Sequence, residues 1–421
     1  MSEPANNRQP LKVAVLSSAS GGGAGIAARR VTDALNLSDA VQADFLDMVA
    51  LGGRMPADAA PPGNMSNRKM TDTHFTVEFP GYVRGWVIDF LQQYDVLNIH
   101  WASFLLGLAE IDELSRRGMP ILFTCHDYYY FTGGCHYPAE CKKLAKGCLG
   151  CPQVNTDHCS TSVIAANLKT KKKLLARPNV HLAAPSAFLV KEAVSAGMIA
   201  PERTHVLRNA YSPVPGVARQ LSDGPTRIVL LADSMTERRK AMPLAIESLA
   251  LAWRELGERS RNNPPFVVDV IGRADDDFIR AVNATGFDYV LHGRITDHKR
   301  IATLLAQCDF LLTCSFEDNW PNVLVEAGSY GVVPIVGPGH GCEEFVREFE
   351  AGRVARGYDV SAFAEAVVDA VKSYTPREVK GIEKAVVQAH SPDYIKEQYI
   401  GTIKHILDAS DRPFCSTHPV H

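Results

Sequence analysis

The residues best suited to chemistry lie between positions 315 and 344, where acids, amides and glycines interrupt an apolar pattern. An apolar run at 310–313 predicts a buried parallel strand, and Asp318 follows it in a polar turn. A short helix is expected from Asn322, with Glu326 inside it. Open α/β sheets bind ligands at the carboxyl ends of their strands, where this turn would lie. The segment therefore predicts a nucleotide-sugar site, with phosphate at the helix N-terminus and sugar hydroxyls on the carboxylates.

A simpler interpretation of the same segment is a plain β-α-β unit. Asp318 would then only cap the helix, and Glu326 would be a solvated helix residue. Pro321 is expected at the first helical position, where its fixed φ suits a first turn, and Gly331 lies where the helix should stop. The residues of this segment alone leave both interpretations open.

Three consecutive cations, Arg238, Arg239 and Lys240, precede a second expected helix at 242–256. Guanidinium and ammonium groups bind phosphate oxygens, so this loop suits a diphosphate. Exposed charge at a helix start is the alternative, which is disfavoured because cations there oppose the helix dipole.

Histidines end two of the expected strands. His126 and Asp127 follow the strand at 120–125, and His100 lies near the end of the strand at 96–101. A lone His-Asp pair is often structural, but strand ends line the ligand-binding edge of a parallel sheet. All three residues are therefore candidates for contact with a substrate.

A glycine-rich turn at 19–25 follows a further strand at 12–17 and precedes a helix. Its glycines, Gly22 and Gly23 among them, let a ligand approach the backbone closely. The turn lacks the Gly-Lys-Ser/Thr of a P-loop and the dinucleotide fingerprint, so glycine that merely permits the turn is the alternative.

Five of the ten cysteines fall in one segment, 133–159. His136 lies in the same segment and could replace one cysteine as a metal ligand. Metal binding would supply folding energy to a loop with few apolar residues. Unligated thiols are one alternative, and two disulfides, which a cytosolic redox poise disfavours, are another. Four of the cysteines have a spacing that suits one tetrahedral structural zinc, namely Cys135, Cys141, Cys148 and Cys151.

The overall composition points to a two-domain cytoplasmic protein. The chain has 421 residues, too many for one ordinary core, and its 44 basic residues nearly balance 47 acidic ones. That balance gives no electrostatic footprint for nucleic acid. The sequence shows neither a run of about twenty apolar residues nor a signal peptide. A basic run at Lys169, Lys171, Lys172 and Lys173 predicts either a solvated helix face or attraction to anionic phospholipid or a lipid diphosphate.

The segment around Glu326 resembles the E-x7-E region of the family 4 retaining glycosyltransferases, with Asp318 in place of the first Glu. That departure leaves the role of the first acid open, and Glu317 could serve only if the turn is shifted by one residue. The Cys-rich stretch GGCHY…CxxCP also resembles an insert of a bacterial exopolysaccharide and colanic-acid-type subgroup. The family's E-A-x-x-x-G-x-P-V/I-V and G-G-x-x-E segments are matched by Glu326, Ala327, Gly331, Pro334, Ile335, Val336, Gly341 and Glu344.

The resemblance implies the α/β GT-B fold, in which two Rossmann-like doubly wound domains face a cleft. The expected acceptor-side domain covers 1–210 and includes the Cys-rich loop. The nucleotide-sugar domain covers 211–390, a helix at 391–409 packs back on the first domain, and 410–421 form a tail.

The resemblance also implies a reaction, the transfer of a hexose with retention from a UDP-sugar or GDP-sugar to a glycan or lipid-linked acceptor. Family frequency favours UDP. Side-chain cations would neutralise the leaving diphosphate, so no cofactor is required for catalysis. The catalytic residues implied are His126, Asp127, Arg239, Lys240 and Glu326. The donor-binding residues implied are Gly22, Gly23, Asn209, Arg238, Gly293, Asp318, Asn319, Pro321, Asn322 and Val323.

Two other functions fit the same pattern, a nucleotide-sugar epimerase and a non-catalytic nucleotide-sugar-binding protein. The composition is also compatible with a peripheral contact of the protein with the inner membrane.

Overall fold

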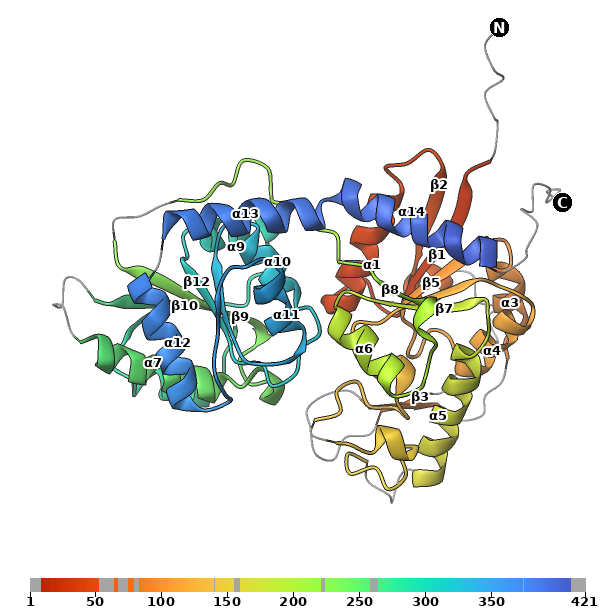
Figure 1. The fold of residues 1–421 in the computed structure, drawn as a ribbon, viewed down its shortest axis with the longest axis horizontal. Helices are drawn as coiled ribbons and strands as arrows, with labels where there is room; N and C mark the ends of the chain where they lie inside the picture. Colours follow the sequence, from red (N-terminus) through yellow and green to blue (C-terminus); the bar gives the residue numbers. More distant parts are fainter. Residues whose placement is uncertain are drawn as a thin grey trace, which may run out of the picture. The chain divides into compact units, whose positions relative to one another are not determined.

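The computed structural model describes residues 9–52, 64–66, 75–78, 83–139, 141–154, 160–220, 224–257, 264–373 and 375–409. The chain divides into two compact units (Figure 1). Unit 1 comprises Met1–Ala210 and Pro392–His421, and unit 2 comprises Tyr211–Ser391. Within the described residues, no helix is both long enough and apolar enough to cross a membrane.

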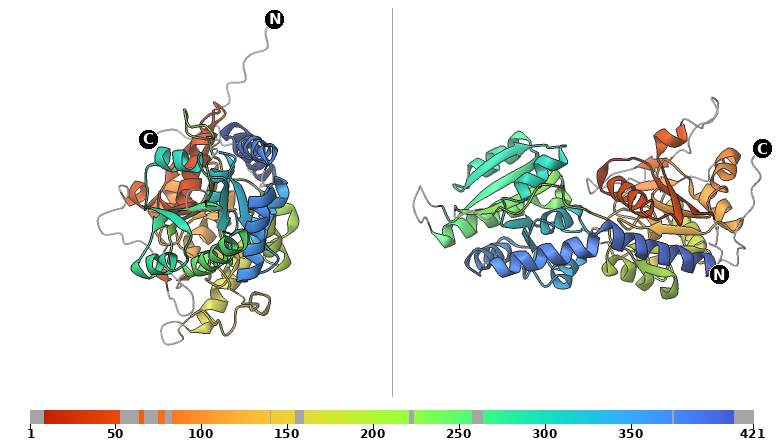
Figure 2. Two further views of the ribbon diagram at one scale, coloured as in Figure 1. Left: turned by 90° about the vertical axis from the view of Figure 1, so that its left-hand side faces the viewer. Right: turned by 90° about the horizontal axis from the view of Figure 1, so that it is seen from above.

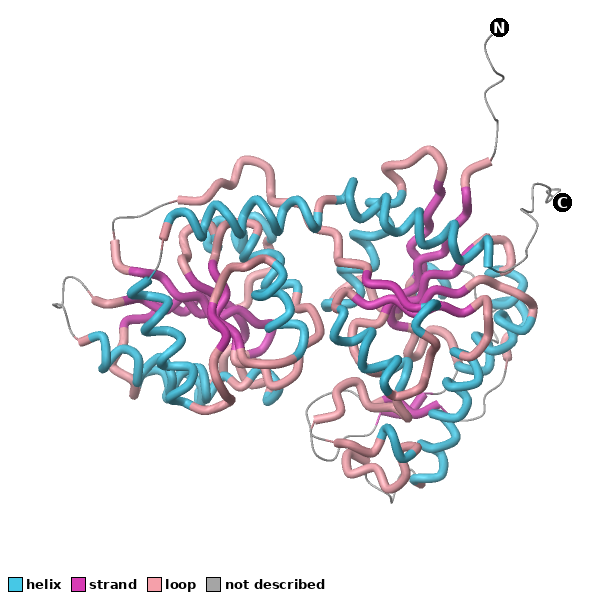
Figure 3. The backbone as a smooth tube through the Cα atoms, in the orientation of Figure 1, coloured by secondary structure: helices cyan, strands magenta, loops and turns pink. Residues whose placement is uncertain are grey.

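Unit 1 is built on a parallel sheet of six strands in the order β2-β1-β5-β6-β7-β8. Figure 3 shows helices on both sides of the strands. The strands are β1 (Leu11–Ser17), β2 (Val41–Leu46), β5 (Val96–Trp101), β6 (Ile121–Thr124), β7 (Val180–Ala184) and β8 (Thr204–Val206), and a small antiparallel pair joins β3 (Asn64–Ser66) to β4 (Thr76–Glu78). The helices are α1 (Gly22–Leu35), α2 (Met48–Gly52), α3 (Gly85–Leu91), α4 (Leu108–Arg116), α5 (Thr161–Leu175), α6 (Ala187–Ser195) and α14 (Pro392–Ala409).

Strand β1 shows why both faces of this sheet are covered. Its side chains alternate between faces, and from Val13 to Leu16 both sets are apolar. Val13 and Val15 pack in a core with α1 and α14, whereas Ala14 and Leu16 pack in a second core with α3 to α6. An apolar run of this kind is typical of a parallel strand buried on both sides.

Unit 2 repeats the plan with a parallel sheet in the order β11-β10-β9-β12-β13-β14. Helices α7 and α12 pack together on one face, and α10 packs with α13 on the other (Figures 1 and 2). The strands are β9 (Thr226–Ser234), β10 (Phe266–Arg273), β11 (Asp288–Gly293), β12 (Phe310–Thr313), β13 (Val333–Val336) and β14 (Arg353–Val354). The helices are α7 (Met242–Leu256), α8 (Asp276–Asn283), α9 (His298–Leu305), α10 (Asn322–Gly328), α11 (His340–Glu348), α12 (Val360–Ser373) and α13 (Pro376–His390).

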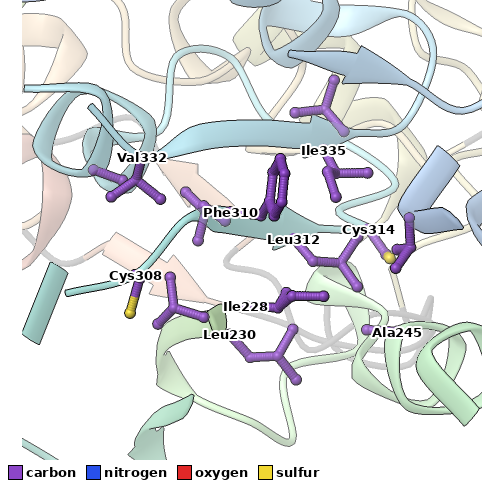
Figure 4. Close-up of a cluster of buried hydrophobic side chains, with 14 of the residues drawn as sticks. Ile228, Leu230, Ala245, Cys308, Phe310, Leu312, Cys314, Val332 and Ile335 are labelled. Atoms are coloured by element: carbon purple, nitrogen blue, oxygen red, sulfur yellow. The ribbon is translucent and has the colours of Figure 1, made fainter. Parts of the chain in front are cut away.

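The core of unit 2 lies on the strands that carry the candidate site. Ile228 and Leu230 of β9 lie beside Phe310 and Leu312 of β12, and all four are buried (Figure 4). Each pair is two residues apart and therefore points to the same face of the sheet. This packing holds the carboxyl ends of β9 and β12 side by side. The observed architecture confirms the predicted α/β class with two doubly wound parallel sheets.

Candidate functional site

Asp318, Arg239 and Lys240 form an ion cluster in unit 2. Lys240 Nζ lies 2.6 Å from Asp318 Oδ2, and Arg239 Nη1 lies 2.9 Å from the same oxygen. The three side chains are only 9 to 14% exposed. Arg239 and Lys240 belong to a 3-10 turn after β9, and Asp318 follows β12. Because β9 and β12 are parallel neighbours in the sheet, their carboxyl ends bring these loops together.

The cluster fixes the charge of the acid. Burial alone would raise the pKa of Asp318, but Lys240 and Arg239 outweigh it and lower that pKa to about 2. The carboxylate is therefore ionised at neutral pH and orients both cations. Arg239 also pairs with Glu237 at 2.8 Å, whereas Arg238 is exposed. The expected contact of Asp318 with donor hydroxyls stays a prediction, because its described ion pairs are with the cations.

The turn after Asp318 is packed against the start of α11. Gly341 N donates to Asp318 O at 3.0 Å, and a Cβ on Gly341 would lie 1.1 Å from Asn319 O. Only glycine allows this approach. Helix α10 begins at Asn322, so the expectation that Pro321 is its first residue was wrong by one position. Pro321 is the N-cap, in an extended conformation that its ring permits, and Val323 follows in the first turn.

Glu326 and Gly293 come from two further elements of unit 2. Glu326 is half-buried on α10, the seven-residue helix that follows the Asp318 turn. Gly293 ends β11 with a φ of 68°, a conformation that suits glycine. The contacts of both residues with a donor stay predictions.

The carboxyl end of the unit 1 sheet holds two histidines in hydrogen-bond contact. His100 Nδ1 lies 2.8 Å from His126 Nε2, and the rings are stacked. Burial lowers the pKa of His126 to about 4 and that of His100 well below its ordinary value. Both imidazoles are therefore neutral at pH 7. His126 offers hydrogen bonds and no positive charge.

Asp127 is hydrogen-bonded to Tyr129 and His136. Its Oδ1 accepts from Tyr129 N at 2.8 Å, and its Oδ2 lies 2.8 Å from His136 Nδ1. Although burial opposes it, the neighbouring His136 lowers the pKa of Asp127. Asp127 thus ties the strand end to the Cys-rich loop.

The proposal that His136 replaces a zinc ligand does not fit the structure. Its Nδ1 contacts Asp127 and its Nε2 lies 3.0 Å from Thr76 Oγ1, so both ring nitrogens are engaged. The ring also stacks on Tyr129 with centroids 4.9 Å apart. No periodic pattern around His136 could have predicted these contacts, because His136 lies in an irregular loop.

Lys171 is the exception in the basic run of α5. Lys169, Lys172 and Lys173 are exposed, but Lys171 is only 1% exposed. Its Nζ donates to Tyr129 O at 2.6 Å and lies 3.6 Å from the centre of the Tyr129 ring. The prediction that all four lysines share a solvated or lipid-facing surface was therefore wrong for Lys171. The ring face stabilises the buried ammonium by a cation–π interaction.

The four cysteines of the predicted zinc site line one cavity of about 280 Å³. All four thiols are free, and burial raises the pKa of Cys135, Cys148 and Cys151. No three Cys, His, Asp or Glu side chains within the described ranges are placed to hold a metal ion. Four thiols are a donor set that zinc prefers, so zinc binding stays a prediction that the metal content of the purified protein tests. The fifth cysteine of the segment, Cys159, lies outside the described residues.

Three other predicted donor-binding residues lie in unit 1. Gly22 and Gly23 are exposed at the start of α1, directly after β1. Asn209 is buried after β8, near the boundary of the unit. All three follow strands of the same parallel sheet, and their contact with a donor stays a prediction.

Asn98 and Thr124 were not singled out from the sequence, yet Asn98 contacts His100 of the histidine pair and Thr124 contacts Asn98. A signal was present, because polar Asn98 and His100 alternate with apolar neighbours on a strand, as do Thr124 and His126. Buried polar side chains are nearly always hydrogen-bonded, so polar residues on two adjacent buried strands predict contacts between them.

Comparison with known proteins adds a family match and structural likenesses. Residues 226–373 match the family described as "Glycosyl transferases group 1". The chain is 24% identical over 256 residues to the putative colanic acid biosynthesis glycosyl transferase WcaC of Escherichia coli (strain K12). That alignment spans 58% of this chain and 58% of the relative.

Two solved structures resemble the whole chain. Anabaena HepE, crystallised with UDP and glucose, has a TM-score of 0.60 at 13% identity and covers 94% of this chain and 100% of its own. The lipopolysaccharide outer core galactosyltransferase WaaB has a TM-score of 0.58 at 13% identity, covering 94% and 99%. These likenesses confirm the predicted fold class, two Rossmann-like domains of the GT-B type, and residues 226–373 of unit 2 form a glycosyl transferases group 1 domain.

Proposed function

We propose that the protein is a retaining glycosyltransferase that moves a hexose from a UDP-sugar to a glycan or lipid-linked acceptor in surface polysaccharide biosynthesis. The observation that carries the proposal is the pair Arg239 and Lys240, oriented by the ionised Asp318 inside the matched domain. The similarity to a relative named for colanic acid biosynthesis supports the polysaccharide, and the UDP and glucose bound by HepE support the donor.

The cations would stabilise the negative charge that builds on the leaving diphosphate. An amine and a guanidinium held in place before the reaction need little reorganisation, which is the main source of electrostatic catalysis. Arg239 is held through Glu237 and Asp318, so its orientation does not depend on the donor. Glu326 would accept hydrogen bonds from donor hydroxyls.

Retention would follow from attack on the face that the diphosphate leaves. The bond from the anomeric carbon to the diphosphate oxygen breaks, and the acceptor oxygen bonds to that carbon on the same side. The acceptor proton passes to the leaving phosphate. This front-face route needs no carboxylate nucleophile, and both acids of the Asp318–Glu326 segment already have other roles in the proposal.

His126 would contact the transferred sugar through a hydrogen bond, and Asp127 would hold the loop beside it. The low pKa of His126 fits a neutral hydrogen-bonding group. The exposed Lys169, Lys172 and Lys173 of α5 are the residues that would contact anionic lipid at the inner membrane.

The test is release of nucleoside diphosphate from a panel of UDP- and GDP-sugars, with and without membrane extract. We expect release that requires the extract. Lys240→Ala and Glu326→Ala should each lower it by roughly 100- to 1,000-fold. Lys299→Ala removes an exposed lysine of unit 2 outside the cluster and should leave release unchanged.

Other outcomes would favour other functions. Turnover of the donor without any acceptor would favour an epimerase. UDP binding without release from any donor and acceptor would overturn the catalytic proposal and leave a nucleotide-sugar-binding protein.

A further inference from the structure

Three buried polar side chains of unit 1 form a hydrogen-bonded chain that ends on the half-buried His126. Asn98 and His100 lie two residues apart on β5, and Thr124 and His126 lie two residues apart at the end of β6. The strands are parallel neighbours with Asn98 opposite Leu122. Asn98, His100 and Thr124 are at most 2% exposed. Three distances join the chain: 2.7 Å from Thr124 Oγ1 to Asn98 Oδ1, 3.2 Å from Asn98 Nδ2 to His100 Nε2, and 2.8 Å from His100 Nδ1 to His126 Nε2.

The donors and acceptors of this chain determine where each proton lies. The Thr124 hydroxyl donates to the amide oxygen of Asn98, so the amide nitrogen faces His100. An amide nitrogen can only donate, and His100 Nε2 must accept. A neutral imidazole carries its proton on the other nitrogen, so His100 donates from Nδ1 to His126 Nε2. His126 is then left with its own proton on Nδ1.

A second observation supports the neutral state of His100 and His126. Burial disfavours the charged form of both imidazoles and so lowers their pKa values. Asp127, the neighbouring carboxylate, accepts from Tyr129 and His136.

We propose that Thr124, Asn98 and His100 are positioning residues that fix His126 as a neutral imidazole protonated on Nδ1. In this tautomer any contact of His126 with the sugar is a donation from Nδ1–H, and Nε2, which accepts from His100, does not act as a general base. The chemistry it recognises is a hydroxyl or ring oxygen of the transferred sugar. This assignment of the sugar rests on the proposed function, whereas the tautomer itself does not.

The experiment is a long-range 1H–15N correlation spectrum of the full-length protein with 15N-labelled histidine at neutral pH. The His126 signals are assigned by their loss in His126→Gln. We expect the pattern of a neutral ring protonated on Nδ1. Thr124→Val removes only the hydroxyl, so the Asn98 side-chain amide is free to turn. Asn98→Leu removes both hydrogen bonds of that amide. Each variant should shift His126 to a mixture of tautomers, and Asn98→Leu should shift it further.

A matched control is available in the same unit. His181 Nδ1 and His205 Nε2 form another histidine pair at 3.1 Å, away from the chain. His205→Gln breaks that pair and should leave the His126 signals unchanged. If Asn98→Leu fails to fold, the near-isosteric Thr124→Val carries the test alone.

Kinetics give the second measurement. Asn98→Leu should lower kcat for transfer by about tenfold with little change in the donor KM, because a wrongly placed proton weakens a contact made in the transition state. An Nε2-protonated or charged His126 in the parent protein, or an unchanged tautomer in both variants, would overturn the inference. The predicted tautomer in a protein that turns over no donor would instead overturn the proposed function and, with it, the assignment of the sugar to His126.

Discussion

The candidate sites of the two units hold their polar residues in opposite electrostatic states. In unit 1, burial keeps His100 and His126 neutral, and the chain around them works through hydrogen bonds alone. In unit 2, Asp318 is buried to a similar degree yet stays charged, because Lys240 and Arg239 face it. Burial alone therefore does not decide the charge of a group, and the partner does. Under the proposed function, the site of unit 1 would bind uncharged hydroxyls and that of unit 2 would bind phosphate.

Unit 1 also contains a buried ion pair, but away from the histidine chain. Arg84 Nε lies 2.7 Å from Glu110 Oε1, and both side chains are at most 4% exposed. Arg84 also donates to Leu105 O, so the pair joins the start of α3 to α4. The contrast in charge is therefore between the two candidate sites. The Arg84–Glu110 pair lies outside both and serves as a control for the loss of a buried charge.

The largest expected effect on stability comes from removing the charge of Asp318. Asp318→Asn leaves two buried cations with a weaker partner, and we expect the free energy of unfolding to fall by about 3 kcal/mol. Glu110→Gln should cost a similar amount in unit 1. Only Asp318→Asn should change the affinity for UDP, which should become tighter because a negative charge is lost near the phosphate. Urea unfolding measures the loss of stability, and calorimetry with UDP measures the change in affinity.

A different result would assign Asp318 to the donor sugar. If Asp318→Asn weakens binding of a UDP-sugar but not of UDP alone, then the carboxylate binds hydroxyls, as the sequence predicted. If the variant is as stable as the parent protein, the ion cluster does not hold the loop.

The second prediction compares the glycines at the two sheet edges. A Cβ on Gly341 would lie 1.1 Å from Asn319 O, and one on Gly25 would lie 2.2 Å from Ala19 O. Alanine at either position forces a helix away from its loop, and we expect each to cost about 1–3 kcal/mol, with Gly341→Ala at the upper end. Gly23→Ala meets no atom within 4 Å and is the control. It should leave stability unchanged, and a loss of stability there as large as that of Gly25→Ala would contradict the close-approach explanation.

The pH dependence of stability should also differ between the units. Burial lowers the pKa of His126, His181 and His205 to about 4. Between about pH 6.5 and pH 4 the unfolded chain binds more protons than the folded one, so the stability of unit 1 falls as the pH falls. The pKa of Asp318 is about 2. The stability that this carboxylate contributes is therefore lost only as the pH falls from about 4, the ordinary pKa of an aspartate, toward 2.

Hydrogen exchange measured by mass spectrometry at a series of pH values would separate the two responses. Peptides of β5 to β7 should lose protection first, by about 1–3 kcal/mol near pH 4, while peptides of β9 and β12 keep theirs. His181→Gln removes one of the three imidazoles and should reduce the loss. Equal loss in both units over this range would contradict the comparison.

The sequence was informative about elements and much less so about contacts. Apolar runs separated by polar turns predicted the strands, because a strand buried on both faces has little other composition. Lys240 pairs with Asp318 only because β9 and β12 are neighbours in the sheet. The order of strands in a sheet cannot be predicted from the residues of either segment. Lys171 could have been placed, because it shares a helix face with Ile164, Leu168 and Leu175 at helical spacing. The position of His136 could not be predicted, because the sequence of an irregular loop does not show where its side chains point.

The smallest expected effects come from two helix caps that repeat the contrast between neutral and charged groups. In unit 1 the Ser186 side chain accepts from Leu189 N at 3.1 Å, and in unit 2 Asp275 Oδ1 accepts from Phe278 N at 2.8 Å. Replacing either residue with alanine should cost about 1 kcal/mol, because one N–H of the first turn loses its acceptor. The Asp275 cap also gains from the helix dipole, a part worth about 0.3–1 kcal/mol that salt screens. Urea unfolding in about 1 M NaCl should therefore shrink the cost of Asp275→Ala and leave that of Ser186→Ala as it was. Equal salt dependence of the two variants would mean that the charge of the cap contributes nothing, and that the contrast between the units is confined to their buried sites.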